Sequence, residues 1–321
     1  MDHIDVFNGD ADGLCALVQL RRAEPKDSNL ITGIKRDINL LKRVKSGINT
    51  NITVLDISLE KNKLDVARLL NDGASIDYVD HHKTGEIIQH PNLKLSIDLD
   101  ANTCTSLIVD QRLNGKYRAW AITAAYGDNL FEKATDLGKK SGYKESELDV
   151  MKELGTLLNY NGYGGDIRDL FFDPAVLFEK LRHFDTPFQF LEQELATYQV
   201  LKEGYKQDIS LAKQTAYIHK TASIAVIELP NEVWARRVSG VFSNQLANDY
   251  TNRAHAVMTK KENGAYLVSV RAPLERKYGA DELVSQFPTG GGRKAAAGIN
   301  DLPEDMLASF IDAMEQQFKP K

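Results

Sequence analysis

Acidic and imidazole side chains recur in the first half of the 321-residue chain, most of them directly after an apolar segment. Carboxylates and imidazoles without a thiolate suit manganese or magnesium better than structural zinc. Several carboxylates gathered at one place would repel one another unless a cation lay between them. The side chains concerned are Asp10, Asp12, Asp56, Asp80, His81, His82 and Asp128.

Such a group of ligands suits the hydrolysis of phosphate esters. Two cations about 3.5–4 Å apart can activate a water molecule and hold a phosphoryl oxygen. One carboxylate usually bridges the two ions, and Asp56 is best placed to do so because its strand is expected in the middle of a sheet. The residue types therefore predict a metal site that can activate water next to a phosphoryl group.

The elements that would position these residues alternate between strand and helix. This βαβα order predicts a mainly parallel sheet with helices on both faces. Because the carboxyl ends of parallel strands meet at one edge, where ligands bind, the acids at the strand ends are expected to lie together. The expected strands are residues 4–7, 52–57, 76–79 and 93–99, and the expected helices are 14–22, 59–70, 103 or 105 to 113, and 119–127.

Each part of this pattern also has an ordinary structural explanation. An Asp-x-Asp-Gly sequence after a strand is more often a turn than a metal site. Asp56 could cap the helix that begins nearby, Asp128 could be a solvated helix end, and a His-His pair is often part of an exposed loop. The order of the four features favours the metal site, because a chance assembly of all four at successive element ends is improbable.

The rest of the chain predicts a linking helix and a second, smaller α/β domain. Residues 134–147 are expected as a polar surface excursion, residues 159–165 as a loop, and the amphipathic stretch 188–213 as one long helix. We expect a metal-binding catalytic domain at residues 1–185, a linking helix at 186–215 and a substrate-binding domain at 216–321. Within the last domain, strands are expected at 224–229, 254–258 and 266–271, and a helix at 238–250.

Residues 290–298 of the second domain have the sequence Gly-Gly-Gly-Arg-Lys-Ala-Ala-Ala-Gly. Consecutive glycines let the backbone approach a ligand closely and present N–H groups to an anion. Arg293 and Lys294 add positive charge, and Arg271 belongs to the same expected domain. Alone, the glycines would indicate a flexible surface loop. Together with the arginines they favour a lobe that binds a phosphate or a base.

In this order, the motifs resemble those of the DHH-family phosphoesterases that carry a DHH-associated C-terminal domain. That group includes RecJ nucleases, nanoRNases and cyclic-dinucleotide phosphodiesterases. The resemblance covers nearly the whole chain. Residues 8–13 resemble the first motif in its RecJ version, Asp56 the second, Asp80-His81-His82 the motif that names the family, Asp128 the fourth, and residues 269–271 and 290–298 the two C-terminal signatures.

The resemblance implies a metal and a set of roles. It implies two Mn²⁺ ions, with Mg²⁺ as an alternative, and attack of an activated water on the phosphate. Asp80 would orient the imidazole of His81, and His82 would face the scissile phosphate. The implied metal ligands are Asp10, Asp12, Asp56, His81 and Asp128, and the implied substrate-binding residues are Arg271, Gly291, Gly292 and Arg293.

Three residues depart from the family pattern. The RecJ branch usually has an acid where this chain has Asn8, and other branches have a histidine where it has Val6. Asn8 or water is then expected to complete the ligands of one metal. Arg293 replaces the histidine that usually follows the three glycines, and its guanidinium keeps a positive charge and bidentate donors for a phosphate.

Composition and length narrow the substrate and the setting. The 40 basic and 45 acidic residues give a formal net charge of -5. This charge argues against binding of long duplex DNA along the whole protein surface. Two cysteines and an acidic N-terminal segment unlike a signal peptide indicate a reducing cytoplasm, and no apolar run is long enough for a membrane span. We expect short oligonucleotides, or linear or cyclic dinucleotides, as substrates, and a homodimer is an open alternative to a monomer.

Two other functions are compatible with the motifs. An exopolyphosphatase or pyrophosphatase would share the Asp-His-His core, and a nucleotide-sensing protein with a crippled site would explain the departures from the family pattern. The intact Asp80-His81-His82 sequence counts against the sensor. Since the implied metal ligands precede residue 130 and the implied substrate-binding residues follow residue 265, we expect the active site in a cleft between the two domains.

Overall fold

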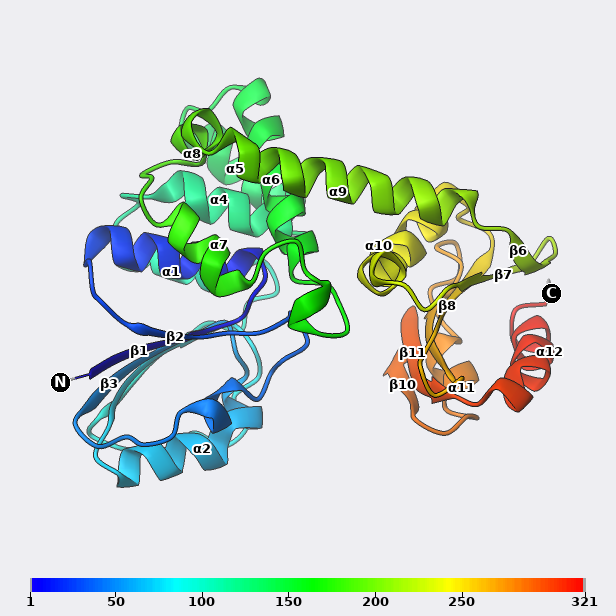
Figure 1. Ribbon diagram of the computed structural model, residues 1–321, viewed down its shortest axis with the longest axis horizontal. Helices are drawn as coiled ribbons and strands as arrows, with labels where there is room; N and C mark the ends of the chain where they lie inside the picture. Colours follow the sequence, from blue (N-terminus) through cyan, green and yellow to red (C-terminus); the bar gives the residue numbers. More distant parts are fainter. Residues whose placement is uncertain (1, 320–321) are drawn as a thin grey trace. The chain divides into compact units, whose positions relative to one another are not determined.

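The structure is a computed structural model that describes residues 2–319 and consists of two compact units. The first unit comprises Met1–Gly204 and the second Tyr205–Lys321. Each unit has its own sheet and its own clusters of buried hydrophobic residues (Figure 1). None of the helices within residues 2–319 combines the length and the apolar character that crossing a membrane requires.

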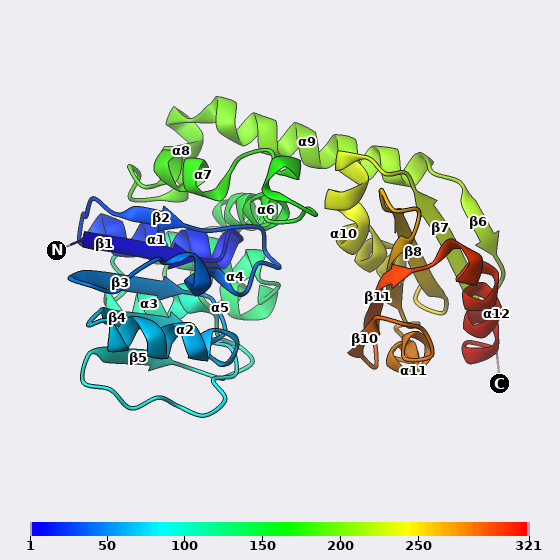
Figure 2. The same ribbon diagram turned by 60° about the horizontal axis from the view of Figure 1, so that its bottom comes forward.

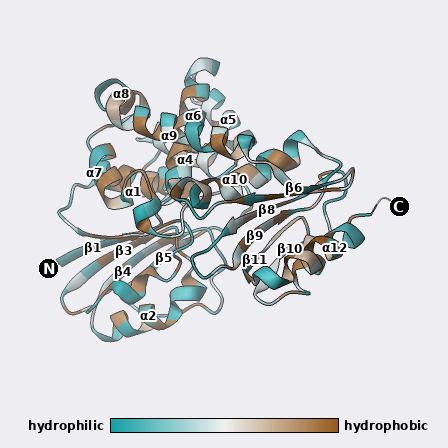
Figure 3. Ribbon diagram, turned by 45° about the vertical axis from the view of Figure 1, so that its right-hand side comes forward, coloured by the Kyte–Doolittle hydropathy of each residue, from teal (hydrophilic) through white to brown (hydrophobic). Residues whose placement is uncertain are grey.

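A five-stranded, fully parallel sheet lies at the centre of the first unit. Its order is β2-β1-β3-β4-β5, so the order reverses between β1 and β3. Figure 3 shows hydrophobic residues along the strands of both sheets, as expected for strands covered by helices. The strands are β1 (Asp2–Phe7), β2 (Asn29–Ile31), β3 (Thr50–Leu55), β4 (Ser75–Asp80) and β5 (Leu93–Ile97).

Helices cover both faces of this sheet, which confirms the predicted fold class (Figure 2). The helix α2 (Leu59–Asn71) and the short helix η1 (Leu40–Arg43) pack on one face through the cluster that contains Val54. On the other face, α1 (Ala11–Ala23) packs against β1 and against two further helices. Those helices are α3 (Thr105–Arg112) and α4 (Arg118–Gly127).

The polar segment at residues 134–147 lies mostly at the surface, as expected, but it is helical rather than a loop. The helices are α5 (Phe131–Lys140) and α6 (Glu145–Asn161), and α6 extends into the expected loop at 159–165. A Cβ on Gly138 would lie 2.2 Å from the side chain of Leu148, so this glycine lets α5 approach α6 closely. Gly142 has a φ of 86° and ends α5, as a glycine at a helix C-terminus often does.

The expected single helix at 188–213 is two helices. They are α8 (Pro187–Gln193), which follows α7 (Pro174–Leu181), and α9 (Leu195–Gln214). The side chain of Thr186 caps α8 by accepting the backbone N–H of Gln189, and Glu194 separates the two helices. The boundary between the two compact units falls within α9.

The second unit contains a six-stranded mixed sheet with the order β10-β11-β9-β8-β7-β6. Only β7 and β8 are parallel neighbours. The helix α10 (Val233–Asp249) covers β8 and β9 on one face, while α11 (Ala280–Val284) and α12 (Leu307–Gln317) belong to the cluster on the opposite face. The strands are β6 (Tyr217–Lys220), β7 (Ile224–Leu229), β8 (Ala254–Lys260), β9 (Tyr266–Arg271), β10 (Gly290–Arg293) and β11 (Ala296–Leu302).

Candidate metal centre

The candidate site lies at the carboxyl ends of three neighbouring parallel strands. Asp10 follows β1, Asp56 follows β3, and Asp80 is the last residue of β4. These strand ends include the point between β1 and β3 where the strand order reverses, and open α/β sheets bind ligands at such a point. The topology therefore brings the strand-end acids together as the sequence pattern predicted.

Three carboxylates converge on the imidazole of His81. Its Nε2 lies 3.4 Å from Asp56 Oδ1, 3.9 Å from Asp12 Oδ2 and 3.9 Å from Asp128 Oδ2. Ligand atoms of Asp12, His81 and Asp128 lie within 4.8 Å of one another, as do those of Asp56, His81 and His82. Oxygen-rich donors with one imidazole fit Mn²⁺ or Mg²⁺.

The carboxylate of Asp12 is held by the start of α3. Its Oδ2 accepts the backbone N–H of Thr105 and its Oδ1 that of Ser106, each at 2.7 Å. The hydroxyl of Thr105 donates to Asp56 Oδ1 at 3.2 Å. These hydrogen bonds fix two candidate ligands before any cation binds, which favours a preformed site.

The electrostatics of the carboxylates also fit a bound cation. Burial raises the pKa of Asp56 well above its usual range, and the charges of Asp12 and Asp10 raise it further. Burial likewise raises the pKa of Asp128 to about 6, again with Asp12 and Asp10 adding to the effect. A divalent ion between these groups would relieve this repulsion.

Lys35, which the sequence patterns did not indicate, also belongs to the site. Its Nζ donates to Asp10 Oδ2 at 2.6 Å and to Asn159 Oδ1 at 2.8 Å, and it lies 3.7 Å from Asp128 Oδ1. Burial alone would lower the pKa of Lys35, but the charge of Asp10, together with Tyr163 and Asp128, raises it above its usual range. Asn159 lies near the end of α6, in the segment that was expected to be a loop.

Asp80 holds His82 rather than His81, which corrects the expected partnership. Asp80 Oδ1 lies 2.7 Å from His82 Nδ1. Alternate residues of an extended chain point to the same side, so the residue two positions after Asp80 is the one within reach. This hydrogen bond raises the pKa of His82 and exceeds the opposing effect of burial. His82 is half-exposed and therefore accessible to a ligand.

The expected substrate-binding residues lie on three neighbouring strands of the second unit. Arg293 on β10 is in register with Ala296 on β11, which is in register with Arg271 on β9. Gly291, Gly298 and Ser269 form the next row. Directly opposite residues of antiparallel strands share a face, so the two arginines border a surface of small residues.

The opposite face of β10 is packed, which separates the roles of the three glycines. A Cβ on Gly290 would lie 1.8 Å from the carbonyl oxygen of Val284 in α11, and one on Gly292 would lie 2.5 Å from Ala297 Cα. A Cβ on Gly291 would meet no atom within 4 Å. The triple-glycine segment is thus an edge strand, with Gly291 on its open face and the other two glycines required by packing.

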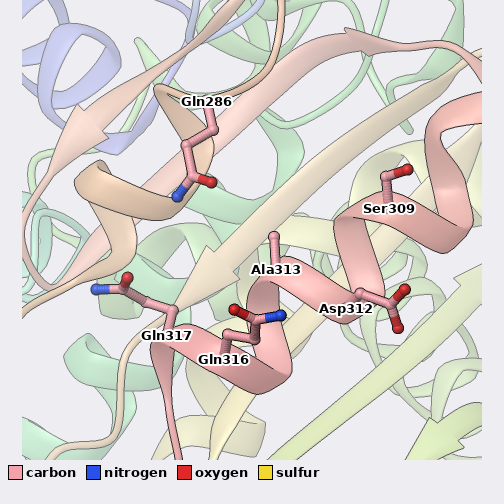
Figure 4. A pocket seen from close by; sticks show the side chains of 6 residues that line it. All are labelled: Gln286, Ser309, Asp312, Ala313, Gln316 and Gln317. Carbon is pink, nitrogen blue, oxygen red and sulfur yellow. The ribbon is translucent and has the colours of Figure 1, made fainter.

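Two surface hollows contain none of the expected site residues. One of about 590 Å³ lies in the second unit and is lined by residues around α12, mainly polar (Figure 4). The other, of about 390 Å³, lies in the first unit at the opposite ends of the strands from the candidate site. Its lining includes Asn51, the second residue of β3, and Ser75, the first residue of β4. Neither hollow combines convergent carboxylates with an imidazole, and neither is assigned a function.

Comparison with known proteins identifies one domain and the fold. Residues 219–320 match the family model of the DHHA1 domain. No curated protein sequence matches the chain. A solved DHH-domain structure, described as a member of a family of ribosomal proteins, gives a TM-score of 0.67 at 14% identity, over 100% of this chain and 87% of that one.

Two further solved structures share the fold over nearly the whole chain. Exonuclease RecJ bound to manganese gives a TM-score of 0.64 at 14% identity, over 99% of this chain and 91% of that one. The pGpG-specific phosphodiesterase PggH from Vibrio cholerae gives 0.56 at 14% identity, over 99% of both chains. The protein is thus a two-unit α/β protein with the fold of these DHH proteins. Residues 219–320 of its second unit match the DHHA1 domain, and the resemblance to the DHH-family phosphoesterases is confirmed at the level of this match and of the fold.

Proposed function

We propose that this protein is an enzyme, a metal-dependent phosphoesterase that hydrolyses phosphodiester or phosphomonoester bonds in small nucleotide substrates. The observation that carries this proposal is the convergence of Asp12, Asp56 and Asp128 on His81 at the strand ends of a parallel sheet. The DHHA1 domain and the likeness to an exonuclease and to a pGpG-specific phosphodiesterase support it.

The proposed cofactor is Mn²⁺, with Mg²⁺ as an alternative. Asp12, Asp56, His81 and Asp128 would hold it, and Asp10 is the further ligand implied by the family resemblance. When bound, a divalent cation supplies Lewis-acid chemistry that makes a water molecule nucleophilic near neutral pH and polarises a phosphoryl oxygen. RecJ with bound manganese supports this choice of metal.

His82 is proposed to hold and move a proton at the reacting phosphate. Asp80 takes the Nδ1–H of the imidazole, which leaves Nε2 directed away from that hydrogen bond. Because the same bond favours the charged imidazole, Nε2 can donate a proton to a phosphate oxygen or to the leaving alcohol. Asp80 is therefore a positioning residue, and His82 is the proposed catalytic residue.

The second unit is proposed to bind the non-reacting part of the substrate. Arg271 and Arg293 border a surface of small residues, and a guanidinium can bind a phosphate through two parallel hydrogen bonds. The Nε of Arg271 is oriented by Asn244 Oδ1 at 2.6 Å. Short oligonucleotides and linear or cyclic dinucleotides are the proposed substrates, with a polyphosphate as the alternative, because either would bring a further phosphate group to these guanidiniums.

A substrate panel with ligand variants tests the proposal. Dinucleotides, cyclic dinucleotides, short RNA, polyphosphate and nucleoside phosphates are each incubated with Mn²⁺ or Mg²⁺. We expect turnover of a nucleotide substrate, and a loss of at least about 10³-fold in Asp56→Asn and His81→Asn. Asp149→Asn, an exposed carboxylate on α6, is the matched control and should remain fully active. Near-native activity in both ligand variants would refute the site.

A further inference from the structure

We propose that the ammonium of Lys35 takes the place of one of the two cations implied by the family resemblance, so that this chain holds a single divalent ion. Asp10 would bind the ammonium of Lys35 instead of a metal ion. The ligands of the single ion would be Asp12, Asp56, His81 and Asp128. This inference rests on the proposed function, since it takes the carboxylate-histidine cluster to be the metal site.

Both oxygens of the Asp10 carboxylate accept hydrogen bonds from the protein without a metal ion. Its Oδ1 accepts the backbone N–H groups of Asp12 and Gly13 at 3.0 and 3.1 Å, at the first turn of α1. Its Oδ2 accepts the Nζ of Lys35 at 2.6 Å. A second cation at Asp10 would have to compete with this hydrogen-bonded ammonium at Oδ2 or with the helix cap at Oδ1.

Asn8 is turned to the backbone and supports Lys35 instead of serving as a metal ligand. Its Oδ1 accepts the backbone N–H of Asp10 at 3.2 Å, and its Nδ2 donates to the carbonyl oxygen of Lys35 at 3.1 Å. One partner is a donor and the other an acceptor, which settles the orientation of the amide. The neutral residue at the position where RecJ proteins usually have an acid therefore helps to fix the lysine.

Lys35 is anchored at both its backbone and its side chain. Its backbone N–H donates to the carbonyl oxygen of Gly162 at 2.8 Å, and its Nζ donates to Asn159 Oδ1. A Cβ on Gly9 would lie 1.9 Å from the carbonyl oxygen of Gly33, so this glycine admits the segment that carries the lysine. The ammonium is thus positioned by several independent contacts, unlike a surface lysine.

The balance of charges at the site matches one ion better than two. Asp80 is a further acid at these strand ends, and it is counted together with its partner, the imidazole of His82, as a neutral pair. Asp10, Asp12, Asp56 and Asp128 supply the remaining four negative charges when ionised. One divalent ion and the ammonium supply three positive charges, whereas two ions and the ammonium would supply five. Positive charges in excess of their ligands repel one another in a buried site.

Lys35 can also act on the substrate. An ammonium has three N–H donors, and two of them serve Asp10 and Asn159. The third makes no hydrogen bond among residues 2–319 and can be donated to a phosphate oxygen. A lysine donor would then supply part of the positive charge that a second ion supplies in a two-metal phosphoesterase.

The experiment counts the bound ions on the full chain. Mn²⁺ stoichiometry is measured by calorimetry and elemental analysis, and the electron paramagnetic resonance spectrum reports whether bound ions are magnetically coupled. We expect one Mn²⁺ per chain and an uncoupled spectrum for the wild type and for Lys35→Arg, which keeps the charge. For Asn8→Asp combined with Lys35→Met, which adds a carboxylate and removes the ammonium, we expect two ions per chain.

The outcomes separate this inference from the proposed function. Two ions of similar affinity in the wild type would overturn the inference and leave the phosphoesterase site standing. One ion in both the wild type and the folded double variant would show that Lys35 does not exclude the second ion, and would also overturn it. A wild type that binds no Mn²⁺ would overturn the proposed function and the inference together.

Discussion

Asp10 and Asp56 have different electrostatic environments because their charged neighbours differ. Burial raises the pKa of Asp10, but the charge and hydrogen bond of Lys35 outweigh burial and lower it overall. Asp56 is buried among other carboxylates, Asp12 and Asp10 foremost, so its pKa is raised. Asp56 should therefore gain more from a bound cation than Asp10 does.

Metal binding should therefore weaken in acid. The pKa of Asp128 is raised to about 6, so a proton competes with the cation for this carboxylate as the pH falls through that value. Without metal, the same raised pKa makes the folded state relatively more stable below about pH 6 than above it. We expect Mn²⁺ affinity, measured by calorimetry, to fall about tenfold or more between about pH 7 and pH 5.

The variant Asp128→Asn provides the control for this titration. It removes one of the groups that must lose a proton, so its Mn²⁺ affinity should be lower at neutral pH and less dependent on pH. Affinity that is independent of pH in the wild type would show that Asp128 is ionised at acid pH or does not bind the ion.

His82 provides a second prediction at the scale of single residues. Asp80 raises the pKa of His82, so Asp80→Asn should lower that pKa and move the alkaline limb of the kcat profile to lower pH. The maximal rate should fall by about 10²-fold or more, because the imidazole loses its orientation. In His82→Asn, both the catalytic rate and the alkaline limb of the kcat profile should be lost. An unshifted alkaline limb in Asp80→Asn would exclude His82 as the group that titrates.

The strand-end acids could be foreseen from the sequence, but Lys35 could not. Asp56 and Asp80 each close an apolar run, and the parallel sheet brings such ends together. Lys35 lies in an irregular connection between β2 and η1, where no periodicity indicates its direction. Its position depends on long-range contacts to Asn159 and Gly162, which only the folded chain provides.

At the scale of elements, apolar runs predicted the positions of strands well, whereas polar composition did not distinguish a helix from a loop. The strands β3 and β4 lie within a residue or two of their expected bounds because each contains consecutive buried apolar residues near its carboxyl end, Val54 and Leu55 in β3 and Tyr78 and Val79 in β4. The helix α5 was not predicted because lysines and a glycine within a polar segment are also typical of a loop. Only the packing of Gly138 against Leu148 explains the glycine within the helix.

The open face of β10 leads to a prediction about Gly291. A methyl group there meets nothing within 4 Å, so Gly291→Ala should unfold at the wild-type temperature. If the backbone of β10 lies against the substrate, the same methyl group should raise KM for a dinucleotide about tenfold or more with little change in kcat. Thermal unfolding and steady-state kinetics measure the two effects.

A neighbouring glycine supplies the contrast. In Gly290→Ala the new methyl group would lie against the Val284 carbonyl oxygen, and we expect a loss of about 1–3 kcal/mol in stability. If Gly291→Ala bound the dinucleotide as tightly as the wild type, the open face of β10 would not be the substrate surface.

At the scale of the whole molecule, the chemistry is divided between two units that each have a core of their own. The candidate metal ligands all lie in the first unit, while Arg271, Arg293 and the triple-glycine strand lie in the second. The clusters around Val54 and around Val268 are composed of residues from one unit each. Each unit therefore has the buried apolar residues that independent folding requires.

This division predicts the behaviour of a shortened chain. A fragment of residues 1–214, which ends with α9, should bind Mn²⁺ with an affinity close to that of the full chain, because every candidate ligand is retained. It should lose most of its affinity for a dinucleotide, since the two arginines and the glycine strand are removed. It should still hydrolyse an activated phosphate ester slowly, because that reaction requires the metal site alone. Circular dichroism first establishes that the fragment is folded, and calorimetry then compares Mn²⁺ and dinucleotide binding.

The full chain with Arg271→Ala and Arg293→Ala is the matched control, and it should show the same loss of dinucleotide affinity with the second unit in place. Equal dinucleotide affinity in the fragment and the full chain would remove the second unit from substrate binding and leave β10 as a structural strand.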